Sequence, residues 1–240
     1  IAARSSAGCF YTAYEAARLA MEHMTPVIML SDGSLGNGSE VFRIPKMADL
    51  PSITPPLAKA DDPNYMPYRR DEKWLRREWA IPGTPGLRHR VGGLEKENGK
   101  GNLSTNPENH QIMTELREEK INRVANDIPL QEIYGDKNAD LLVVSWGGTF
   151  GTVRTAVEGL MEEGKSIAHA HFDYIMPLPR NTEEVLQGHK KIVVCEINRG
   201  QFAKYLRMNF PEYKCEQFNK VMGLPFTIGE LEAKFNDLLK

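Results

Sequence analysis

The second half of the sequence predicts an α/β fold with a mostly parallel sheet that helices cover on both faces. Apolar runs of strand length, without polar alternation, indicate strands that are buried on both faces. These runs are Leu141–Trp146, Ile167–Phe172 and Lys191–Ile197. Segments with helical apolar spacing stand between and after them, and this alternation favours parallel strands joined by right-handed crossovers.

A glycine turn follows the first of these strands and opens a helix. Gly147 and Gly148 come directly after the apolar run, and Gly151 precedes a stripe with helical spacing. Gly164 ends this helix. The stripe consists of Val153, Ala156, Val157, Leu160 and Met161.

The remaining elements follow in the same alternating order. Asn181–Glu184 has the residue pattern of a capping box and predicts a short helix that ends at Gly188. Asn198–Gly200 turns the third strand into a helix that carries apolar residues from Phe202 onward, and Cys215–Met222 is a candidate fourth strand. Thr227–Glu230 is a second capping-box pattern, which opens the last helix.

Residues 1–45 predict one helix and one strand. A helical stripe runs from Phe10 to Met24, Pro26 ends the helix, and Val27–Leu30 predicts a short buried strand. One helix and one strand cannot enclose a core. We therefore expect this stretch to be the end of a truncated domain, and the chain to be the C-terminal part of a longer subunit.

Residues 46–134 predict a proline-rich linker arm between two domains. Eight prolines between Pro45 and Pro85 exclude long helices and central strands, and four aromatic residues are candidate anchors. Asn106-Pro107-Glu108 predicts the start of one amphipathic helix. The prolines are at positions 45, 51, 55, 56, 63, 67, 82 and 85, and the aromatic residues are Tyr65, Tyr68, Trp74 and Trp79.

Composition and charge exclude several classes of protein. The net charge of −2 gives no reason to expect a nucleic-acid or membrane partner, and no apolar run is long enough to span a bilayer. The three cysteines, Cys9, Cys195 and Cys215, are dispersed, which indicates reduced thiols in a cytoplasmic protein. Three such thiols cannot hold a four-cysteine iron–sulfur cluster, so we expect any cluster to lie in a partner.

The Gly147–Gly151 turn is a candidate phosphate site, because free N–H groups at a helix N-terminus attract anions. Asp173, after the next strand, is the acid that could contact a ribose. The pattern is G-G-x-x-G, however, and matches neither the dinucleotide fingerprint nor the P-loop. The alternative interpretation is that the glycines only permit a tight turn and close helix packing.

Other polar residues have equally open interpretations. His169 and His171 share one face of a strand with spacing suited to a metal, or they are a packed pair. Asp32 and Asn37 lie in a glycine-rich loop that could approach a phosphate or metal, or could be a flexible connection. Residues 69–78 are a candidate phosphate patch, or a solvated face in which acids dilute the positive charge. His89, His110 and His189 form no recognisable constellation, and no complete active site is visible.

Four stretches of the sequence together resemble one known family. They are TPVIMLSDGSLGNGSE (25–40), SWGGTFGTVRTAVEGL (145–160), PLP (177–179) and CEINRGQ (195–201). They are similar to the C-terminal portion of the α subunit of 2-oxoacid:ferredoxin oxidoreductases, and most similar to the 2-oxoglutarate type.

The resemblance implies three regions. Residues 1–45 would be the tail of a truncated α/β domain that binds the pyrimidine of thiamine diphosphate, and residues 46–134 the linker arm. Residues 135–240 would be a three-layer α/β/α sandwich similar to the transketolase C-terminal domain. In the family, the thiamine ylide attacks a 2-oxoacid, CO2 leaves, electrons pass to an iron–sulfur partner, and coenzyme A takes the acyl group.

The resemblance also implies where the chemistry lies. The activating glutamate and the substrate contacts would precede Ile1, while the diphosphate, magnesium and cluster sites would belong to a β subunit, with ferredoxin reached through the complex. We therefore expect the chain to be a structural, interface-forming part of the enzyme that has no catalytic, cofactor-binding or metal-binding residue of its own. A homo-oligomer is compatible with this expectation. The alternative is a nucleotide- or coenzyme A-binding module that uses the Gly147–Gly151 turn. A second alternative is an assembly module that buries Trp74, Trp79 and the His169/His171 face against a partner.

Overall fold

The computed structural model describes residues 1–240, which divide into two compact units. The first, which we call the sheet unit, comprises Ile1–Ala13, Met29–Arg43 and Ile128–Lys240. The second, which we call the arm unit, comprises Tyr14–Ile28 and Ile44–Asp127. None of the helices combines the length and the apolar character that crossing a bilayer requires.

The sheet unit contains a four-stranded, fully parallel sheet in the order β2-β1-β3-β4. The strands are β1 (Leu141–Trp146), β2 (Ile167–Phe172), β3 (Lys191–Glu196) and β4 (Cys215–Asn219). The first two coincide with the sequence prediction, whereas β3 ends one residue earlier and β4 three residues earlier than expected. In the register, Leu141 on the central strand pairs with Ile167 on one side and Lys191 on the other.

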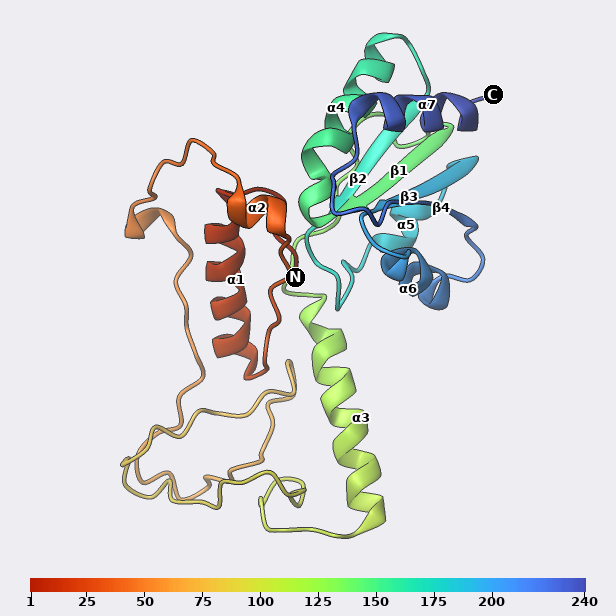
Figure 1. The fold of residues 1–240 in the computed structure, drawn as a ribbon. Coiled ribbons are helices and arrows are strands. Elements are labelled where there is room, and N and C mark those ends of the chain that lie inside the picture. The colour runs from red at the N-terminus through yellow and green to blue at the C-terminus, as the bar shows by residue number, and fades with distance from the viewer. The chain divides into compact units, whose positions relative to one another are not determined.

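Helices cover both faces of this sheet, which confirms the expected three-layer α/β/α architecture (Figure 1). Leu141 and Val143 face α4 (Phe150–Glu162) and α7 (Ile228–Leu238), while Leu142 and Val144 face α5 (Thr182–Leu186) and α6 (Gln201–Asn209). All four of these β1 side chains are fully buried. Full burial of each such side chain contributes roughly 1.5–3 kcal/mol, so the apolar run of β1 anchors both cores at once.

The capping predictions have mixed outcomes. Thr227 and Glu230 form a capping box on α7, as expected. Asn181, in contrast, makes no side-chain cap on α5, so that prediction was wrong. Its carboxamide instead accepts a hydrogen bond from the backbone N–H of Gln131 and donates one to the carbonyl of Gln131. A long-range pair has replaced the local cap.

Residues 1–45, which the two units share, differ in part from their prediction. Helix α1 (Gly8–His23) forms as expected, but Val27–Leu30 is no buried strand and pairs only through one bridge between Leu30 and Ala2. A strand needs neighbours, and no other strand lies beside this segment. The loop 31–40 also contains a short helix, α2 (Gly33–Asn37), which Asp32 caps by accepting from the backbone N–H groups of Ser34 and Leu35.

The arm unit contains the part of α1 from Tyr14 onward, α3 (Pro107–Val124), a single 3₁₀ turn (Met47–Asp49) and extended segments. Asn106 caps α3 with proline at its first position, as the sequence predicts. The tryptophans anchor the irregular chain: Trp79 donates from its indole to the carbonyl of Met21 (2.7 Å), and Trp74 packs edge-on against His23. Prolines prevent regular strands here, so side-chain contacts order the segment instead.

Candidate functional site

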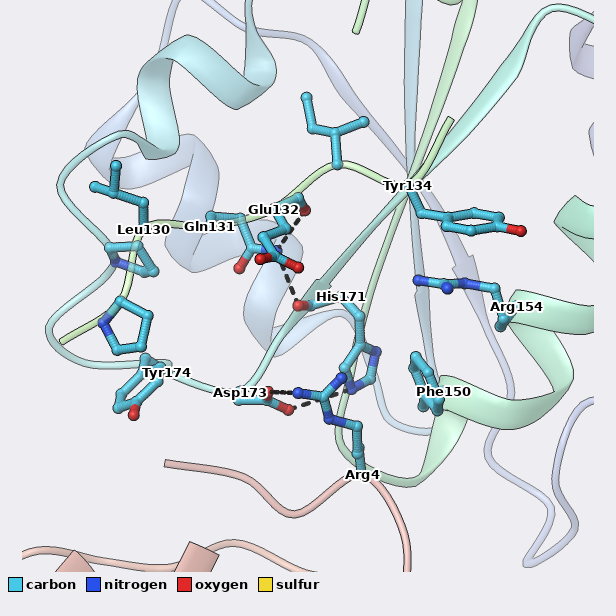
Figure 2. Close-up of a pocket in the computed structure, with 13 residues that line it drawn as sticks. Arg4, Leu130, Gln131, Glu132, Tyr134, Phe150, Arg154, His171, Asp173 and Tyr174 are labelled. Carbon is cyan, nitrogen blue, oxygen red and sulfur yellow. Dashed lines mark hydrogen bonds and ion pairs between the residues drawn. The ribbon is translucent and has the colours of Figure 1, made fainter. Parts of the chain in front are cut away.

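A cavity of about 360 Å³ lies at the carboxyl end of β2, within the sheet unit. Figure 2 shows its polar lining, with Arg154 reaching in between the rings of Tyr134 and Phe150, and Arg4 beside Asp173. These side chains come from separate stretches of the sequence, which the parallel sheet gathers at one edge. His171 also lines the cavity, and its ring contacts the buried hydroxyl of Ser145 in the interior.

A buried hydrogen-bond chain connects Arg154 to His171. The guanidinium Nε of Arg154 donates to Nδ1 of His169 (3.1 Å), and Nε2 of His169 lies 2.7 Å from the hydroxyl of Ser145. That hydroxyl lies 2.8 Å from Nδ1 of His171. Ser145 lies on the strand beside the two histidines and on the same face of the sheet, because β1 and β2 are in parallel register and Ser145 pairs with His171.

The donor and acceptor properties of these side chains determine which nitrogen of each histidine carries its proton. Arginine can only donate, so Nδ1 of His169 must be the acceptor, and the proton of neutral His169 lies on Nε2. His169 therefore donates to Ser145, and Ser145 donates to Nδ1 of His171, which places the His171 proton on Nε2. That Nε2 is buried, has no hydrogen-bond partner, and lies 3.8 Å from the carboxylate of Asp173.

Burial keeps both imidazoles neutral. It lowers the pKa of His169 to about 3, with the positive charge of Arg154 as a second cause. Burial likewise lowers the pKa of His171 well below its ordinary value. Burial also raises the pKa of Asp173, against the opposing effect of Arg4, which forms an ion pair with it.

The histidine pair is therefore packed and hydrogen-bonded, and its geometry does not suit a metal. Both ring nitrogens of His169 are engaged, one as acceptor and one as donor, so neither offers a lone pair to an ion. The structure contains no group of three or more His, Cys, Asp or Glu residues that could hold a metal ion. The arrangement favours the interpretation of a structural pair over that of a metal site.

The neutral pair predicts that stability decreases in acid. His169 has a folded pKa of about 3 against 6.5 in a model peptide, so between these values the unfolded chain binds more protons than the folded one. The free energy of unfolding then falls by about 1.4 kcal/mol per pH unit for each such histidine. Asp173, with its raised pKa, acts in the opposite sense at lower pH.

Urea denaturation at pH 7.5 and pH 5.0 measures this effect. We expect a lower midpoint at pH 5.0, together with imidazole ¹⁵N shifts in the folded state that keep the neutral tautomer with the proton on Nε2 of His169. Protonation of His169 within the folded state at pH 5.0 would contradict the assignment.

The glycine turn after β1 packs against the carboxylate of Asp32. Gly147 adopts a left-handed backbone with φ of 61°, and a Cβ on Gly148 would overlap Oδ2 of Asp32. Asp32, Gly148 and Thr149 line a cavity of about 490 Å³ at the carboxyl ends of β1 and β3. A phosphate beside Gly148 would meet the negative charge of Asp32. The turn therefore favours the interpretation of close packing over that of phosphate binding.

This contact predicts that Gly148→Ala destabilises the sheet unit. The added methyl group must displace Asp32 from the start of α2, and such overpacking costs roughly 1–3 kcal/mol. Gly151→Ala is the matched control, because its Cβ would meet nothing within 4 Å and it lies inside α4. There alanine is expected to stabilise by roughly 0.5–1 kcal/mol. Thermal unfolding of both variants measures the difference; equal melting temperatures would contradict the contact.

The CEINRGQ stretch connects β3 to α6 through one buried acid. The carboxylate of Glu196 accepts from the backbone N–H groups of Phe202 and Ala203, each at 2.9 Å, and from the indole of Trp146 at 3.1 Å. Asn198 adds a side-chain acceptor for the N–H groups of Gly200 and Gln201. Glu196 therefore joins this stretch to the end of β1. Sequence reasoning missed this role, although an acid between a buried strand and a helix is its signal.

The cysteines lie far from any common site. Cys195 packs in the core facing α4 and α7, whereas Cys215 packs in the core on the opposite face of the sheet. Burial raises the pKa of both thiols, that of Cys215 to about 11. Neutral thiols on opposite faces cannot ligate one iron–sulfur cluster, because a cluster needs thiolates around it.

The other candidates have local partners. Asn37 donates to the carbonyl of Gly33 inside α2. His89 contacts the carbonyl of Leu87, His110 contacts Glu95, and His189 contacts the carbonyl of Ala139. The sheet unit thus gathers His169, His171 and Asp173 near one cavity, and Asp32, Asn37 and Gly148 around another, but not His89, His110 or His189.

Comparison with known proteins identifies the family. No family model matches the chain. Over 232 residues it is 44% identical to the 2-oxoglutarate oxidoreductase subunit KorA of Mycobacterium tuberculosis, a match that covers 96% of this chain and 35% of that protein. The chain belongs to the family of 2-oxoacid:ferredoxin oxidoreductase α subunits. Another α subunit of this family, from Aeropyrum pernix, is 29% identical over 242 residues and matches 96% of the chain and 37% of its own length.

A solved structure of the same family has the same fold. The chain superimposes with a TM-score of 0.89 and 28% identity on the 2-oxoglutarate:ferredoxin oxidoreductase of Magnetococcus marinus, which carries 2-oxoglutarate, coenzyme A and succinyl-CoA. The match covers 100% of this chain and 42% of that one. The chain therefore spans well under half the length of the family members it matches.

Proposed function

We propose that this chain is part of the α subunit of a thiamine-diphosphate-dependent 2-oxoacid:ferredoxin oxidoreductase, with 2-oxoglutarate as substrate. The parent enzyme would decarboxylate the 2-oxoacid, transfer the acyl group to coenzyme A and pass electrons to ferredoxin in the cytoplasm. The observation that carries the proposal is the 44% identity to the mycobacterial 2-oxoglutarate oxidoreductase subunit. The coenzyme A and 2-oxoglutarate in the Magnetococcus marinus enzyme support it.

Within that enzyme the chain would have a structural and interface role. Residues 135–240 would act as the transketolase C-terminal-like domain, residues 1–45 as the tail of the pyrimidine-binding domain, and residues 46–134 as the arm. Exposed apolar side chains in the segment after β4 and at the start of α7 support subunit contact, because side chains of this kind gather at interfaces. They are Val221, Met222, Leu224 and Ile228, which are 63%, 71%, 60% and 40% exposed.

The residues of this chain do not fit the metal cofactors of the parent enzyme. Magnesium requires a cluster of oxygen donors and an iron–sulfur cluster requires thiolates, and the chain offers neither. The proposal therefore places the diphosphate, magnesium and the iron–sulfur cluster in a β subunit. The contribution of this chain is to pack, orient and bury the surfaces on which that subunit sits.

Two assays test the proposal. The complex of the whole α subunit with its β subunit should reduce ferredoxin when 2-oxoglutarate and coenzyme A are both present, and more slowly with pyruvate. The chain alone, supplied with thiamine diphosphate and magnesium, should release no CO2 from 2-oxoglutarate. Decarboxylation by the chain alone would refute the structural role, while a complex that is inactive with every 2-oxoacid would refute the family activity.

A further inference from the structure

A cavity of about 540 Å³ in the arm unit has an excess of positive charge. Five cationic side chains and two acidic ones line it, all of them from the segment 69–78. In the sequence this segment looks balanced, because its acids stand next to its bases. The structure shows how those charges are actually paired.

Both acids are already neutralised by two of the arginines. Glu78 forms an ion pair with Arg69 at 3.1 Å, and Asp71 forms one with Arg76 at 3.5 Å. Asp71 is further engaged by the backbone N–H of Trp74. Among the side chains that line the cavity, Arg70, Lys73 and Arg77 therefore remain without a carboxylate partner, and the third acid of the segment, Glu72, does not line it.

Backbone and aromatic contacts hold the two unpaired arginines in place. Nη1 of Arg70 donates to the carbonyl of Leu75 at 2.9 Å, while its Nε is buried and has no hydrogen-bond partner. The guanidinium of Arg77 lies 4.2 Å from the centre of the Tyr68 ring and donates to the carbonyl of Pro67. Arg70 and Arg77 both line the cavity, so these contacts hold two guanidinium groups at its wall.

Like charges also crowd this region. Burial lowers the pKa of Arg70, and the neighbouring Arg77 and Arg117 lower it further. Burial likewise lowers the pKa of Lys120 to about 8, again with Arg70 and Arg77 as contributing causes. A multivalent anion would relieve this repulsion, whereas a single carboxylate would neutralise only one of the unpaired cations.

We propose that this cavity binds an oligophosphate group, with Arg70 and Arg77 donating to phosphate oxygens. The guanidinium fork matches phosphate geometry, and charge-assisted hydrogen bonds of this kind are the strong ones. Such a site is additional to the oxidoreductase role and does not depend on it. The phosphates can belong to inorganic pyrophosphate or to a nucleotide, which share this chemistry.

Calorimetry on the full chain tests the site, with inorganic pyrophosphate as the probe. The double variant Arg70→Gln/Arg77→Gln should weaken pyrophosphate binding by at least about tenfold. The control Arg88→Gln/Arg90→Gln removes the same two charges from exposed positions of the arm unit that do not line the cavity. Because exposed charges outside the cavity are screened by salt, the control should bind within about threefold of the parent chain at 0.15 M salt.

The outcomes separate the proposal from non-specific adsorption. Absence of binding to the parent chain at about 10 mM pyrophosphate would overturn it, since that excludes even millimolar affinity. Equal weakening in both double variants would overturn it as well. Circular dichroism checks that the variants are folded. If the double variant is unfolded, the single variant Arg77→Gln replaces it, and we expect that variant to bind pyrophosphate at least about fivefold more weakly than the parent chain. Competition by ADP for the same site would assign the phosphates to a nucleotide, and lack of competition to an inorganic ion.

Discussion

Glu196→Ala should unfold the sheet unit at a much lower urea concentration than the parent chain requires. The wild-type carboxylate is fully buried and accepts three hydrogen bonds, two from the start of α6 and one from Trp146. Alanine leaves the two buried N–H groups and the part-buried indole without this acceptor, and each buried donor without a partner costs roughly 1–3 kcal/mol. We expect a loss of about 4 kcal/mol, which is a large part of the stability of an ordinary domain. Urea denaturation monitored by tryptophan fluorescence measures it.

Two further variants make this result specific. Glu196→Gln keeps the size of the side chain but turns one acceptor into a donor that faces backbone N–H groups, so an intermediate loss is expected. Glu212→Ala removes an acid that is exposed in the turn before β4, and should change the free energy of unfolding by less than about 0.5 kcal/mol. If Glu196→Ala were as harmless as Glu212→Ala, the buried cap of α6 would be refuted.

Ser145→Ala should destabilise the sheet unit nearly as strongly. The serine hydroxyl is the hydrogen-bonded link between the two buried imidazoles, because it accepts from Nε2 of His169 and donates to Nδ1 of His171. Its removal leaves one buried donor and one buried acceptor without a partner, which lowers the free energy of unfolding by roughly 2–4 kcal/mol. The loss of only one oxygen atom makes a cavity too small to explain a change of that size. Thermal unfolding of the variant measures the loss.

The control for this variant is Ser52→Ala, at an exposed position of the arm unit. It should leave the melting temperature unchanged within about 1 °C, because surface substitutions usually have small effects. Ser145→Thr retains the hydroxyl and is expected to retain more of the stability than alanine does. A Ser145→Ala variant that melts with the parent chain would show that the hydroxyl is not the shared partner of the histidines.

The alternation of apolar runs and helical stripes was sufficient to predict the parallel sheet and the helices that cover it. The runs at Leu141–Trp146 and Ile167–Phe172 are strands with those bounds, because a strand that is buried on both faces has little freedom in its composition. The capping box at Thr227 was equally predictable, since cap and helix lie within four residues. Local patterns succeeded wherever the structure is decided locally.

The failures have long-range causes. Asn181 has the residue pattern of a cap, but it pairs with the backbone of Gln131, 50 residues away in the sequence. The segment Val27–Leu30 has strand composition, but no neighbouring strand completes a sheet there. The roles of Asp32 beside Gly148 and of Glu196 beside Trp146 are likewise contacts between distant segments, which spacing along the chain does not encode.

The cavity at the end of β2 offers the strongest test of the structural role proposed for this chain, because it brings an arginine, a histidine and an aspartate together. The most direct measurement is 2-oxoglutarate-dependent ferredoxin reduction by the whole complex carrying Arg154→Gln. If the chain holds no catalytic residue, kcat should stay within about threefold of the parent enzyme once the complex is assembled. A fall in kcat of about 100-fold, with KM and melting temperature unchanged, would place transition-state chemistry at Arg154 and contradict the structural role.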